Sequence, residues 1–393
     1  MFKRFLHHFK TLFIYICYLL FRMLPIQKNL ILFESVQDCS DNSWAMYKFL
    51  QKRNPAYRFV WLCHSTETRQ KHIAEERTRF IYHHFGFHSL ADCMALARAG
   101  NIFYTHGITR LFKRRKGQNM VNLWHGIALK APKGVNKPPK HEFNAVLCLS
   151  EENRQNQARF IKCDERLILP LGYPRNDLLL NNNACGKSNP FAPKDFQGKV
   201  IIWMPTFRAS VLQVISETTC DTDTGLPLLN TLESISFFND FLIQTHVFCI
   251  IKIHPLQSQK EVFKQQFSNL LFLTNDQLEQ KGLQVYEMLG HSDALLTDYS
   301  SVFFDYYILD KPIGFILSDM EEYRKSRGEF VVSDPLSVMA GRHIYSEADL
   351  KEFVKDVAEE RDNEAQMRHA TAQRMILHRD ANSCERIAQY CKL

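Results

Sequence analysis

The segment of residues 294–317 limits the choice of fold more than any other part of the chain. It begins with the short apolar run Ala294–Thr297, and the next four residues, 298–301, have turn and helix-capping chemistry. The apolar run Val302–Leu309 is typical of a buried helix, and the β-rich run Ile313–Leu317 follows a break that contains proline. The segment therefore predicts a strand, a turn, a helix and a second strand, which together form a βαβ unit.

The turn between the first strand and the helix has the chemistry of a phosphate site. Free backbone N–H groups and the positive end of a helix dipole attract anions at such a position. Thr297, Asp298, Ser300 and Ser301 are therefore candidate ligands of a phosphate. The alternative is structural: the two serines cap a buried helix, and Asp298 orients the turn through bonds from its side chain to the backbone.

Two series of apolar runs, each alternating with polar or helix-compatible segments, extend this pattern over most of the chain. Such alternation predicts parallel sheets with crossover helices. We predict a first α/β domain at 29–182, a linker rich in Asn, Gly, Pro and Ser at 183–198, and a second domain with terminal helices at 199–393. The runs are 30–35, 58–63, 79–84, 101–106, 120–125, 145–150 and 166–171 in the first series, and 200–205, 247–253, 269–274, 294–297 and 313–317 in the second.

Polar and charged residues follow several of these runs. Open parallel sheets bind ligands at the carboxyl ends of their strands, and His125, Arg208, His254 and the Ser300–Ser301 pair occupy such positions. We therefore predict one site formed by both domains. A histidine at a strand end is also commonly a structural residue without a chemical role.

The first 28 residues are basic and apolar. They contain five Lys or Arg residues, no acidic residue, and an apolar run at 12–21. A ten-residue helix is about 15 Å long, roughly half the thickness of a bilayer core, so it is too short to span. We predict that residues 1–28 lie in a membrane interface; a helix buried against the domain and a signal peptide are the alternatives.

Cysteine and carboxylate patterns argue against metal and disulfide sites. The 11 cysteines occur singly and without a CxxC pair, which favours a reducing cytosol over a disulfide framework or a zinc site. Asp221 and Asp223 could hold a divalent metal, but they lie in a polar stretch with no strand before it, which is typical of a solvated loop. We predict no metal site.

Basic residues are concentrated in the first domain. Between Asp92 and Glu142 there is no acidic residue but there are ten Lys or Arg residues. The pattern fits a solvated face, or a surface that attracts anionic lipid headgroups or a phosphate-rich polymer. No nucleic-acid-binding motif accompanies it, and a net charge of +7 is modest for 393 residues, so we predict no nucleic-acid partner.

Six motifs, which occur in order along the chain, resemble those of a known protein family. Together they resemble the CDP-glycerol glycerophosphotransferase family, whose members prime and polymerise teichoic-acid-like polymers, and the resemblance runs from about residue 33 to residue 387. The motifs are NLWHGIALK (122–130), LGYPRNDLLL (171–180), WMPTFR (203–208), IIKIHP (250–255), TDYSS (297–301) and DMEEYRKSRGEF (319–330).

The resemblance implies a GT-B-like fold, in which two Rossmann-like domains face each other across a cleft. The implied reaction transfers a polyol phosphate, with glycerol phosphate expected, from CDP-glycerol to a lipid-linked or polymeric glycan acceptor, and releases CMP. Such a reaction serves bacterial teichoic-acid or capsular polysaccharide synthesis. The enzyme would bind peripherally to the cytoplasmic face of the membrane, with the acceptor on the first domain and the donor on the second.

This chemistry assigns roles to residues in the motifs. We predict His125 as the general base and His254 as a residue that contacts phosphate oxygens or protonates the leaving group. Positive charge for the pyrophosphate would come from four further residues, and no cofactor or metal is expected for the chemistry. These residues are Arg208, Lys252, Arg324 and Arg327.

Two other functions remain open. One is a GT-B glycosyltransferase that uses a nucleotide sugar such as CMP-sialic acid. The other is a non-catalytic, membrane-bound subunit that binds a nucleotide during assembly. The sequence does not distinguish glycerol from ribitol, a primase from a polymerase, or capsule from wall polymer.

Overall fold

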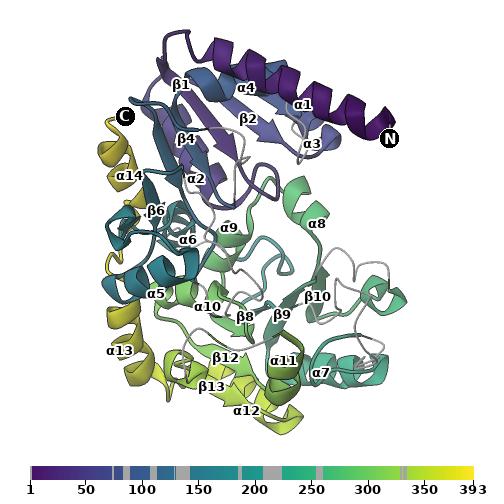
Figure 1. Cartoon of the computed structure of the whole chain (residues 1–393). Helices are drawn as coiled ribbons and strands as arrows, with labels where there is room; N and C mark the ends of the chain where they lie inside the picture. Colours follow the sequence, from purple (N-terminus) through teal and green to yellow (C-terminus); the bar gives the residue numbers. More distant parts are fainter. Residues whose placement is uncertain are drawn as a thin grey trace. The chain divides into compact units, whose positions relative to one another are not determined.

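The chain forms two compact α/β units, each built on one parallel sheet (Figure 1). The structure is a computed structural model that describes residues 2–72, 75–82, 89–106, 113–127, 129, 142–184, 188–206, 224–253, 260–327, 330 and 334–393. The first unit comprises Met1–His125, Val135–Asp177 and Asp380–Leu393, and the second comprises Gly126–Gly134 and Leu178–Arg379. Two parallel-sheet α/β domains are thus confirmed.

The first unit has a seven-stranded sheet in the order β3-β2-β1-β4-β5-β6-β7, and all its neighbouring strands are parallel. The nearly continuous apolar sequences of these strands fit a sheet that is covered on both faces. The strands are β1 (Gln27–Glu34), β2 (Arg58–Cys63), β3 (Thr78–Tyr82), β4 (Ala99–Tyr104), β5 (Asn119–Asn122), β6 (Ala145–Leu147) and β7 (Ile168–Leu169).

Aromatic side chains dominate the core of this unit. The ring of Phe33 lies 5.3 Å from Trp61 and 5.5 Å from Phe103 on the neighbouring strands, and 5.6 Å from Tyr47 on the helix that covers them. All four side chains are fully buried. The helices of the unit are α1 (Phe2–Phe21), α2 (Asp41–Arg53), α3 (Thr66–Lys71), α4 (Leu90–Arg98), α5 (Glu151–Ile161), the short η1 (Glu165–Leu167) and α14 (Ser383–Cys391), and the first residues of α6 (Pro174–Ala184) also belong to it.

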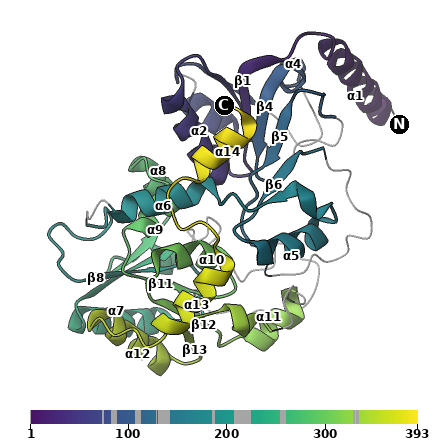
Figure 2. The same cartoon turned by 90° about the vertical axis from the view of Figure 1, so that its left-hand side faces the viewer.

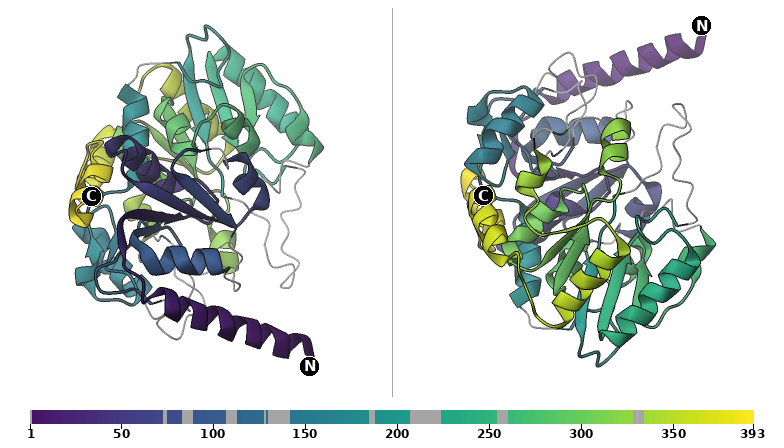
Figure 3. Two further views of the ribbon diagram at one scale, coloured as in Figure 1. Left: turned by 90° about the horizontal axis from the view of Figure 1, so that it is seen from above. Right: turned by 90° about the horizontal axis from the view of Figure 1, so that it is seen from below.

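Helix α1 packs against α4 (Figure 3). Part of its surface is exposed. Ile14 and Tyr18 are buried, and the Tyr18 hydroxyl donates a hydrogen bond to the carbonyl oxygen of Lys113 (2.9 Å). Among the described helices, none is both long and apolar enough to cross a bilayer. The exposed large side chains of α1 recur at helical spacing and form what we call the apolar stripe: Leu12, Phe13, Ile16, Leu19 and Leu20.

The C-terminal helix α14 belongs to the first unit, which differs from the predicted domain limits. Asp177 explains this placement, because its carboxylate accepts hydrogen bonds from the backbone N–H groups of Ser383 (2.9 Å) and Cys384 (2.8 Å) at the start of α14. The boundary between the units falls inside α6, and residues 183–198, predicted as a linker, belong to the second unit. The returning chain therefore closes the first unit with a segment that is distant in sequence.

The second unit has a six-stranded parallel sheet in the order β10-β9-β8-β11-β12-β13. Its strands are β8 (Lys199–Trp203), β9 (Val247–Lys252), β10 (Leu270–Leu273), β11 (Ala294–Thr297), β12 (Ile313–Ile316) and β13 (Arg342–Ile344). Its helices are α7 (Leu232–Gln244), η2 (Glu261–Lys264), α8 (Asn275–Gln280), α9 (Val285–Gly290), α10 (Val302–Tyr306), η3 (Tyr307–Leu309), α11 (Met320–Arg327), η4 (Pro335–Val338), α12 (Glu347–Ala358) and α13 (Ala365–Met375).

Helices cover both faces of this second sheet (Figure 2). Side chains of α7 and α12, such as Phe238 and Phe353, share one core cluster with Ile316 of β12. The adjacent residue Phe315 points to the other face, because successive residues of a strand alternate, and its ring meets that of Phe303 on α10 at 5.0 Å. The carboxyl ends of strands β8, β9 and β11 therefore lie together at one end of the parallel sheet, between the two layers of helices.

Candidate functional site

A turn that follows β5 carries His125 and is held from two sides within the first unit. The side-chain amide of Asn42 on α2 donates hydrogen bonds to the carbonyl oxygens of Leu123 (3.1 Å) and Trp124 (3.0 Å). Arg175 on α6 donates from Nη1 to the carbonyl oxygen of His125 (3.0 Å) and to Asp41 (2.8 Å). Because Asn42 and Arg175 are buried, these bonds fix the backbone of the turn.

The backbone of the turn is itself unusual. Trp124 has a φ of 59°, and Gly126 has a φ of 131°. A left-handed conformation is uncommon for a bulky residue and persists only where the surrounding structure requires it. Here the bonds from Asn42 to the carbonyl oxygens of Leu123 and Trp124 supply that requirement.

The ring of His125 has a defined tautomer. Its Nδ1 lies 3.2 Å from the carbonyl oxygen of Thr105, and a carbonyl can only accept, so Nδ1 carries the proton. Nε2 is then unprotonated and can accept a proton from a substrate. The ring of Trp124 stacks on His125 at 4.5 Å, and the ring of His106 stacks on it at 4.0 Å with the planes 9° apart.

The surroundings lower the pKa of both stacked histidines. Neighbouring protein atoms that exclude water from part of the ring lower the pKa of His125, although the residue as a whole is exposed. The Arg175 charge lowers it further, and the bond to Thr105 and the charge of Asp41 oppose the shift. The same exclusion of water, and then the proximity of His125, lowers the pKa of His106 to about 4. Both rings are therefore neutral at neutral pH, which suits His125 as a general base.

Other polar groups gather at the same edge of the first sheet. Glu34 ends β1 and is buried, and its Oε1 lies 2.9 Å from Nε2 of His64, which follows β2. The second oxygen of Glu34 has no hydrogen-bond partner among the described residues. The sequence prediction missed His106, Glu34 and Arg175. Their signal was available, because His106 and Glu34 end or follow apolar runs as His125 does, and Arg175 lies in the LGYPRNDLLL motif.

In the second unit, Asp298 joins the ends of two strands. Its carboxylate accepts hydrogen bonds from the backbone N–H (2.8 Å) and the hydroxyl (2.5 Å) of Thr206, which follows β8. Thr297 donates from its hydroxyl to the carbonyl oxygen of Met204 (3.0 Å). Both Thr297 and Asp298 are fully buried. In this geometry the side chains of Thr297 and Asp298 connect β8 to β11.

Ser300 and Ser301 lie directly before α10 and are partly exposed. The Ser301 side chain does not cap the helix, and α10 itself has only five residues before it tightens into η3. Neither serine hydroxyl bonds to another described residue. The backbone N–H groups at this turn are thus not covered by a side-chain cap, and a ligand oxygen could accept from them.

The same turn is attached to the segment that begins α11. The Tyr299 hydroxyl donates to Asp319 (3.0 Å), and its ring stacks on Tyr323 with centroids 4.0 Å apart. Arg324 and Arg327 lie on α11, within one turn of Tyr323. The motifs TDYSS and DMEEYRKSRGEF, separate in the sequence, therefore meet in the second unit.

Lys252 ends β9 and has an amine that is largely shielded from water. Burial lowers the pKa of Lys252 to about 8, against an opposing charge from Asp276. Its Nζ donates to the carbonyl oxygen of Ile253 (3.2 Å). A poorly hydrated ammonium group at the carboxyl edge of a parallel sheet is well suited to bind phosphate.

Several predicted residues cannot be placed. Arg208, His254 and the Asp221–Asp223 pair lie outside the described residues, as do the side chains of Arg324 and Arg327. Within the parts of the chain that are described, no group of His, Cys, Asp or Glu has the arrangement of a metal site. Predictions for these positions remain predictions.

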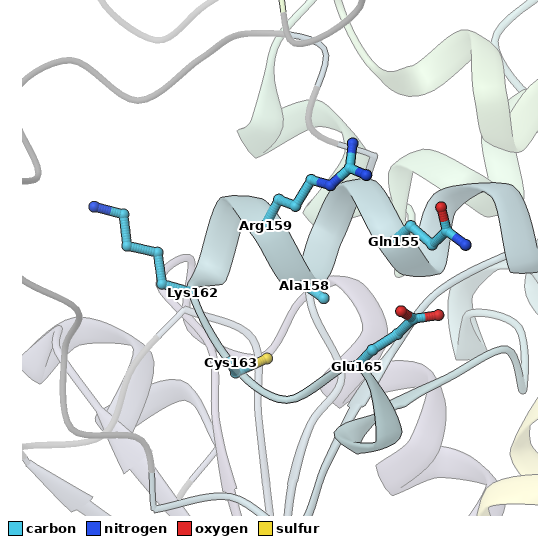
Figure 4. A pocket seen from close by; sticks show the side chains of 6 residues that line it. All are labelled: Gln155, Ala158, Arg159, Lys162, Cys163 and Glu165. Atoms are coloured by element: carbon cyan, nitrogen blue, oxygen red, sulfur yellow. The ribbon is translucent and has the colours of Figure 1, made fainter.

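A surface pocket occurs elsewhere in the first unit (Figure 4). It lies at the end of α5 and contains none of the predicted site residues. Its lining residues are Gln155, Ala158, Arg159, Lys162, Cys163 and Glu165.

Comparison with known proteins identifies the family. The sequence profile of the family described as CDP-Glycerol:Poly(glycerophosphate) glycerophosphotransferase matches residues 16–392, and the chain belongs to this family. It is 26% identical to a teichoic acid ribitol-phosphate primase of Bacillus spizizenii, over 95% of this chain and 93% of that protein. It is 28% identical to a teichoic acid poly(glycerol phosphate) polymerase of Staphylococcus epidermidis, over 78% of this chain but only 43% of that longer protein.

Solved structures show the same fold. A single-residue variant of the wall teichoic acid polymerase TagF superposes with a TM-score of 0.77 at 20% identity, over 100% of this chain and 96% of that chain. A variant of the same polymerase soaked with CDPG superposes with a TM-score of 0.71 at 19% identity, over the same shares. The chain therefore has the same fold as the wall teichoic acid polymerase TagF.

Proposed function

We propose that this member of the glycerophosphotransferase family transfers glycerol phosphate from CDP-glycerol to a lipid-linked or polymeric glycan acceptor and releases CMP. The observation that carries the proposal is the geometry of His125. A bond to a backbone carbonyl fixes its tautomer, neighbouring groups keep it neutral, and its Nε2 can therefore take a proton from an acceptor hydroxyl.

The reaction is a displacement at phosphorus. The acceptor oxygen attacks the phosphorus of glycerol phosphate while its proton moves to Nε2 of His125. The bond from that phosphorus to the bridging oxygen of the pyrophosphate breaks, and CMP leaves with the electron pair. Charge accumulates on phosphate oxygens in the transition state, so the site needs fixed positive groups more than it needs further covalent chemistry.

We assign the donor to the second unit. The TDYSS turn offers uncapped backbone N–H groups, and Lys252 offers a partly desolvated ammonium group at the same sheet edge. His254, Arg208, Arg324 and Arg327 are proposed to complete the binding of the pyrophosphate, as the motifs that contain them suggest. These cations supply the charge that a metal would otherwise supply, so we propose chemistry without a metal cofactor.

The comparisons with known proteins offer a second candidate for the polyol. A ribitol-phosphate primase of Bacillus spizizenii matches over 93% of its length, and a glycerol-phosphate transferase of Staphylococcus aureus matches over 96% of its length. Ribitol phosphate is therefore the second candidate donor group.

We also propose that the enzyme works on the cytoplasmic face of a bacterial membrane, held by the apolar stripe of α1. Five large apolar side chains of this helix are exposed at helical spacing, a pattern that favours the interface of a bilayer. The segment that α1 contacts through Lys113 carries the exposed side chains of Lys113, Arg114 and Lys116, which complement anionic lipids.

A panel of CDP-polyols tests the reaction. The full chain is incubated with a synthetic lipid-linked acceptor and CDP-glycerol, CDP-ribitol or CMP-sialic acid. CMP release is then measured together with the mass of the product. We expect an acceptor that is heavier by one or more polyol phosphates. A product that carries a sugar would support the glycosyltransferase alternative, and binding of CDP-polyols without turnover would support the assembly subunit.

A further inference from the structure

The stacked histidines His106 and His125 form a pair that the reaction described so far does not use. Their ring centroids are 4.0 Å apart and their planes are within 9° of parallel. His106 follows β4 and His125 follows β5, and these two strands are neighbours in the sheet. The parallel register, which pairs Tyr104 with Asn122, brings the ends of the two strands together.

His106 is itself held in place. A hydrogen bond of 2.9 Å joins its Nδ1 to the hydroxyl of Thr105, whose carbonyl group accepts from His125. Thr105 is buried and is thus a common support for both rings. One residue therefore contacts both imidazoles.

The charges around the pair are few. Arg175 on α6 and Asp41 on α2 are the charged groups that act on both rings, and they bond to each other at 2.8 Å. The two opposite charges partly cancel at the histidines. The main contribution of His106 to the environment of His125 is therefore the uncharged face of its ring.

We propose that His106 is a positioning residue, whose ring holds the His125 imidazole in one plane and excludes water from one of its faces. Nε2 of His125 then points in a constant direction and remains available as a proton acceptor. This inference rests on the proposed function for its catalytic consequence, but the pairing itself can be measured without any reaction.

The packing of His106 also has a consequence for the protonated state. When His125 accepts a proton, a neutral ring beside it does not repel the new charge, whereas a protonated neighbour would. Because the pKa of His106 is lowered to about 4, that neighbour is neutral at neutral pH. A phenylalanine ring would supply the same flat, neutral surface without any ability to exchange protons.

The first experiment measures the titration of His125 directly in the full chain. Histidines labelled with carbon-13 are followed by NMR as the pH is varied, and the signal of His125 is assigned by its loss in His125→Asn. We expect the pKa of His125 to rise in His106→Ala, because water then reaches the uncovered face, and to stay near its original value in His106→Phe. The control is His369→Ala, which removes a half-exposed histidine of the second unit.

An unchanged pKa of His125 in a folded His106→Ala protein would overturn the proposal. If His106→Ala does not fold, His106→Phe decides, since a phenylalanine that cannot hold the His125 titration near its original pH would contradict a role based on packing. This measurement does not depend on the identity of the substrate. Its failure is therefore distinct from a failure of the proposed reaction.

The second experiment measures the pH dependence of transfer with whichever CDP-polyol proves active. Since His125 acts in its neutral form, kcat/KM should decline toward low pH in a limb that reports its pKa. For His106→Ala we expect that limb to move to higher pH, so that the loss of activity is greater at about pH 5.5 than at about pH 8. His106→Phe should restore the limb. If His106→Phe does not restore the limb and only a variant with a titratable side chain at position 106 does, the result would instead indicate proton transfer through His106.

Discussion

Arg175 Nη1 lies 3.0 Å from the carbonyl oxygen of His125, although 50 residues separate them in the sequence. The same nitrogen donates to Asp41, so one guanidinium joins α6, α2 and the turn after β5. The Arg175 side chain bonds to the backbone of His125 and does not touch its ring, yet this bond controls the position of the candidate base. The position of a general base can thus depend on a residue with no chemical part in the reaction.

Replacement of Arg175 by Gln should destabilise the first unit. Arg175 is 3% exposed, and its loss leaves the carbonyl oxygen of His125 and the carboxylate of Asp41 without their donor. We expect a decrease of about 2–4 kcal/mol in the free energy of unfolding, measured by urea denaturation. As a control, Arg166→Gln removes an ion pair at the exposed surface and should leave the urea denaturation curve unchanged.

The two motif histidines should differ in their effects on binding. His125→Ala removes the proposed base and should reduce transfer by about 10²–10⁴, with CDP affinity within a few-fold of the wild type. His254→Ala should also abolish transfer but weaken donor binding by about 1–3 kcal/mol, because a charge-assisted contact is lost.

Initial rates of CMP release, paired with calorimetric titration of CDP, separate these outcomes. If the binding defect belongs to His125→Ala instead, the donor and acceptor assignments of the two units must be exchanged. Retention by His125→Ala of more than about a tenth of the wild-type turnover would contradict its role as a base.

The sequence predicted the sheets well, because their strands are fully buried and therefore read as continuous apolar runs. Ala294–Thr297 forms β11 with the predicted limits, and the run at 58–63 forms β2. The runs that end in histidine were predicted too long, since β4 ends at Tyr104 and β5 at Asn122. In both places the strand stops where the parallel pairing stops, and the last residues of the run form the site.

Contacts distant in sequence could not be predicted from local patterns. β13 was missed because its sequence, Arg342–Ile344, is short and contains two basic or titratable residues. Gly100 is typical of a helix stop, yet it lies in β4, where a Cβ atom would come within 2.7 Å of the Lys28 backbone on β1. The return of α14 to the first unit and the stacking of His106 on His125 likewise depend on tertiary packing.

Asp298→Asn should loosen the junction between β8 and β11. The asparagine amide presents donors where Thr206 needs an acceptor for its backbone N–H and its hydroxyl, and the site is fully buried. We expect a loss of about 1–3 kcal/mol in stability and a weaker affinity for CDP, since the TDYSS turn is displaced. Thr206→Val removes only the hydroxyl bond and should give a smaller loss in both urea denaturation and CDP titration. Equal stability of Asp298→Asn and the wild type would show that this junction is not required.

The affinity for CDP should depend on the charge of Lys252. Burial lowers the pKa of this amine to about 8, so it is protonated below that pH and loses its charge as the pH rises. CDP affinity should therefore be constant below about pH 8 and fall above it; bound phosphate stabilises the ammonium form and moves the fall upward. Titration calorimetry over this range is the measurement. Lys252→Met should bind CDP more weakly and without this alkaline decrease, and an identical decrease in that variant would assign it to another group.

Substitutions in the apolar stripe of α1 should remove membrane binding without unfolding the protein. Ile16 and Leu20 are exposed, so Ile16→Gln with Leu20→Gln leaves the packing of Ile14 and Tyr18 against the first unit unchanged. Burial of such side chains in a bilayer contributes about 1.5–3 kcal/mol each, so the double variant should lose most of its affinity for anionic vesicles in co-sedimentation. Tyr18→Phe is the matched control, because it deletes the hydrogen bond to Lys113 and should reduce stability by about 1 kcal/mol while vesicle binding persists.

If both variants bind vesicles as the wild type does, the stripe is excluded as the membrane contact. A change of oligomeric state in the double variant, seen by sedimentation velocity without vesicles, would show instead that a second copy of the chain covers the stripe.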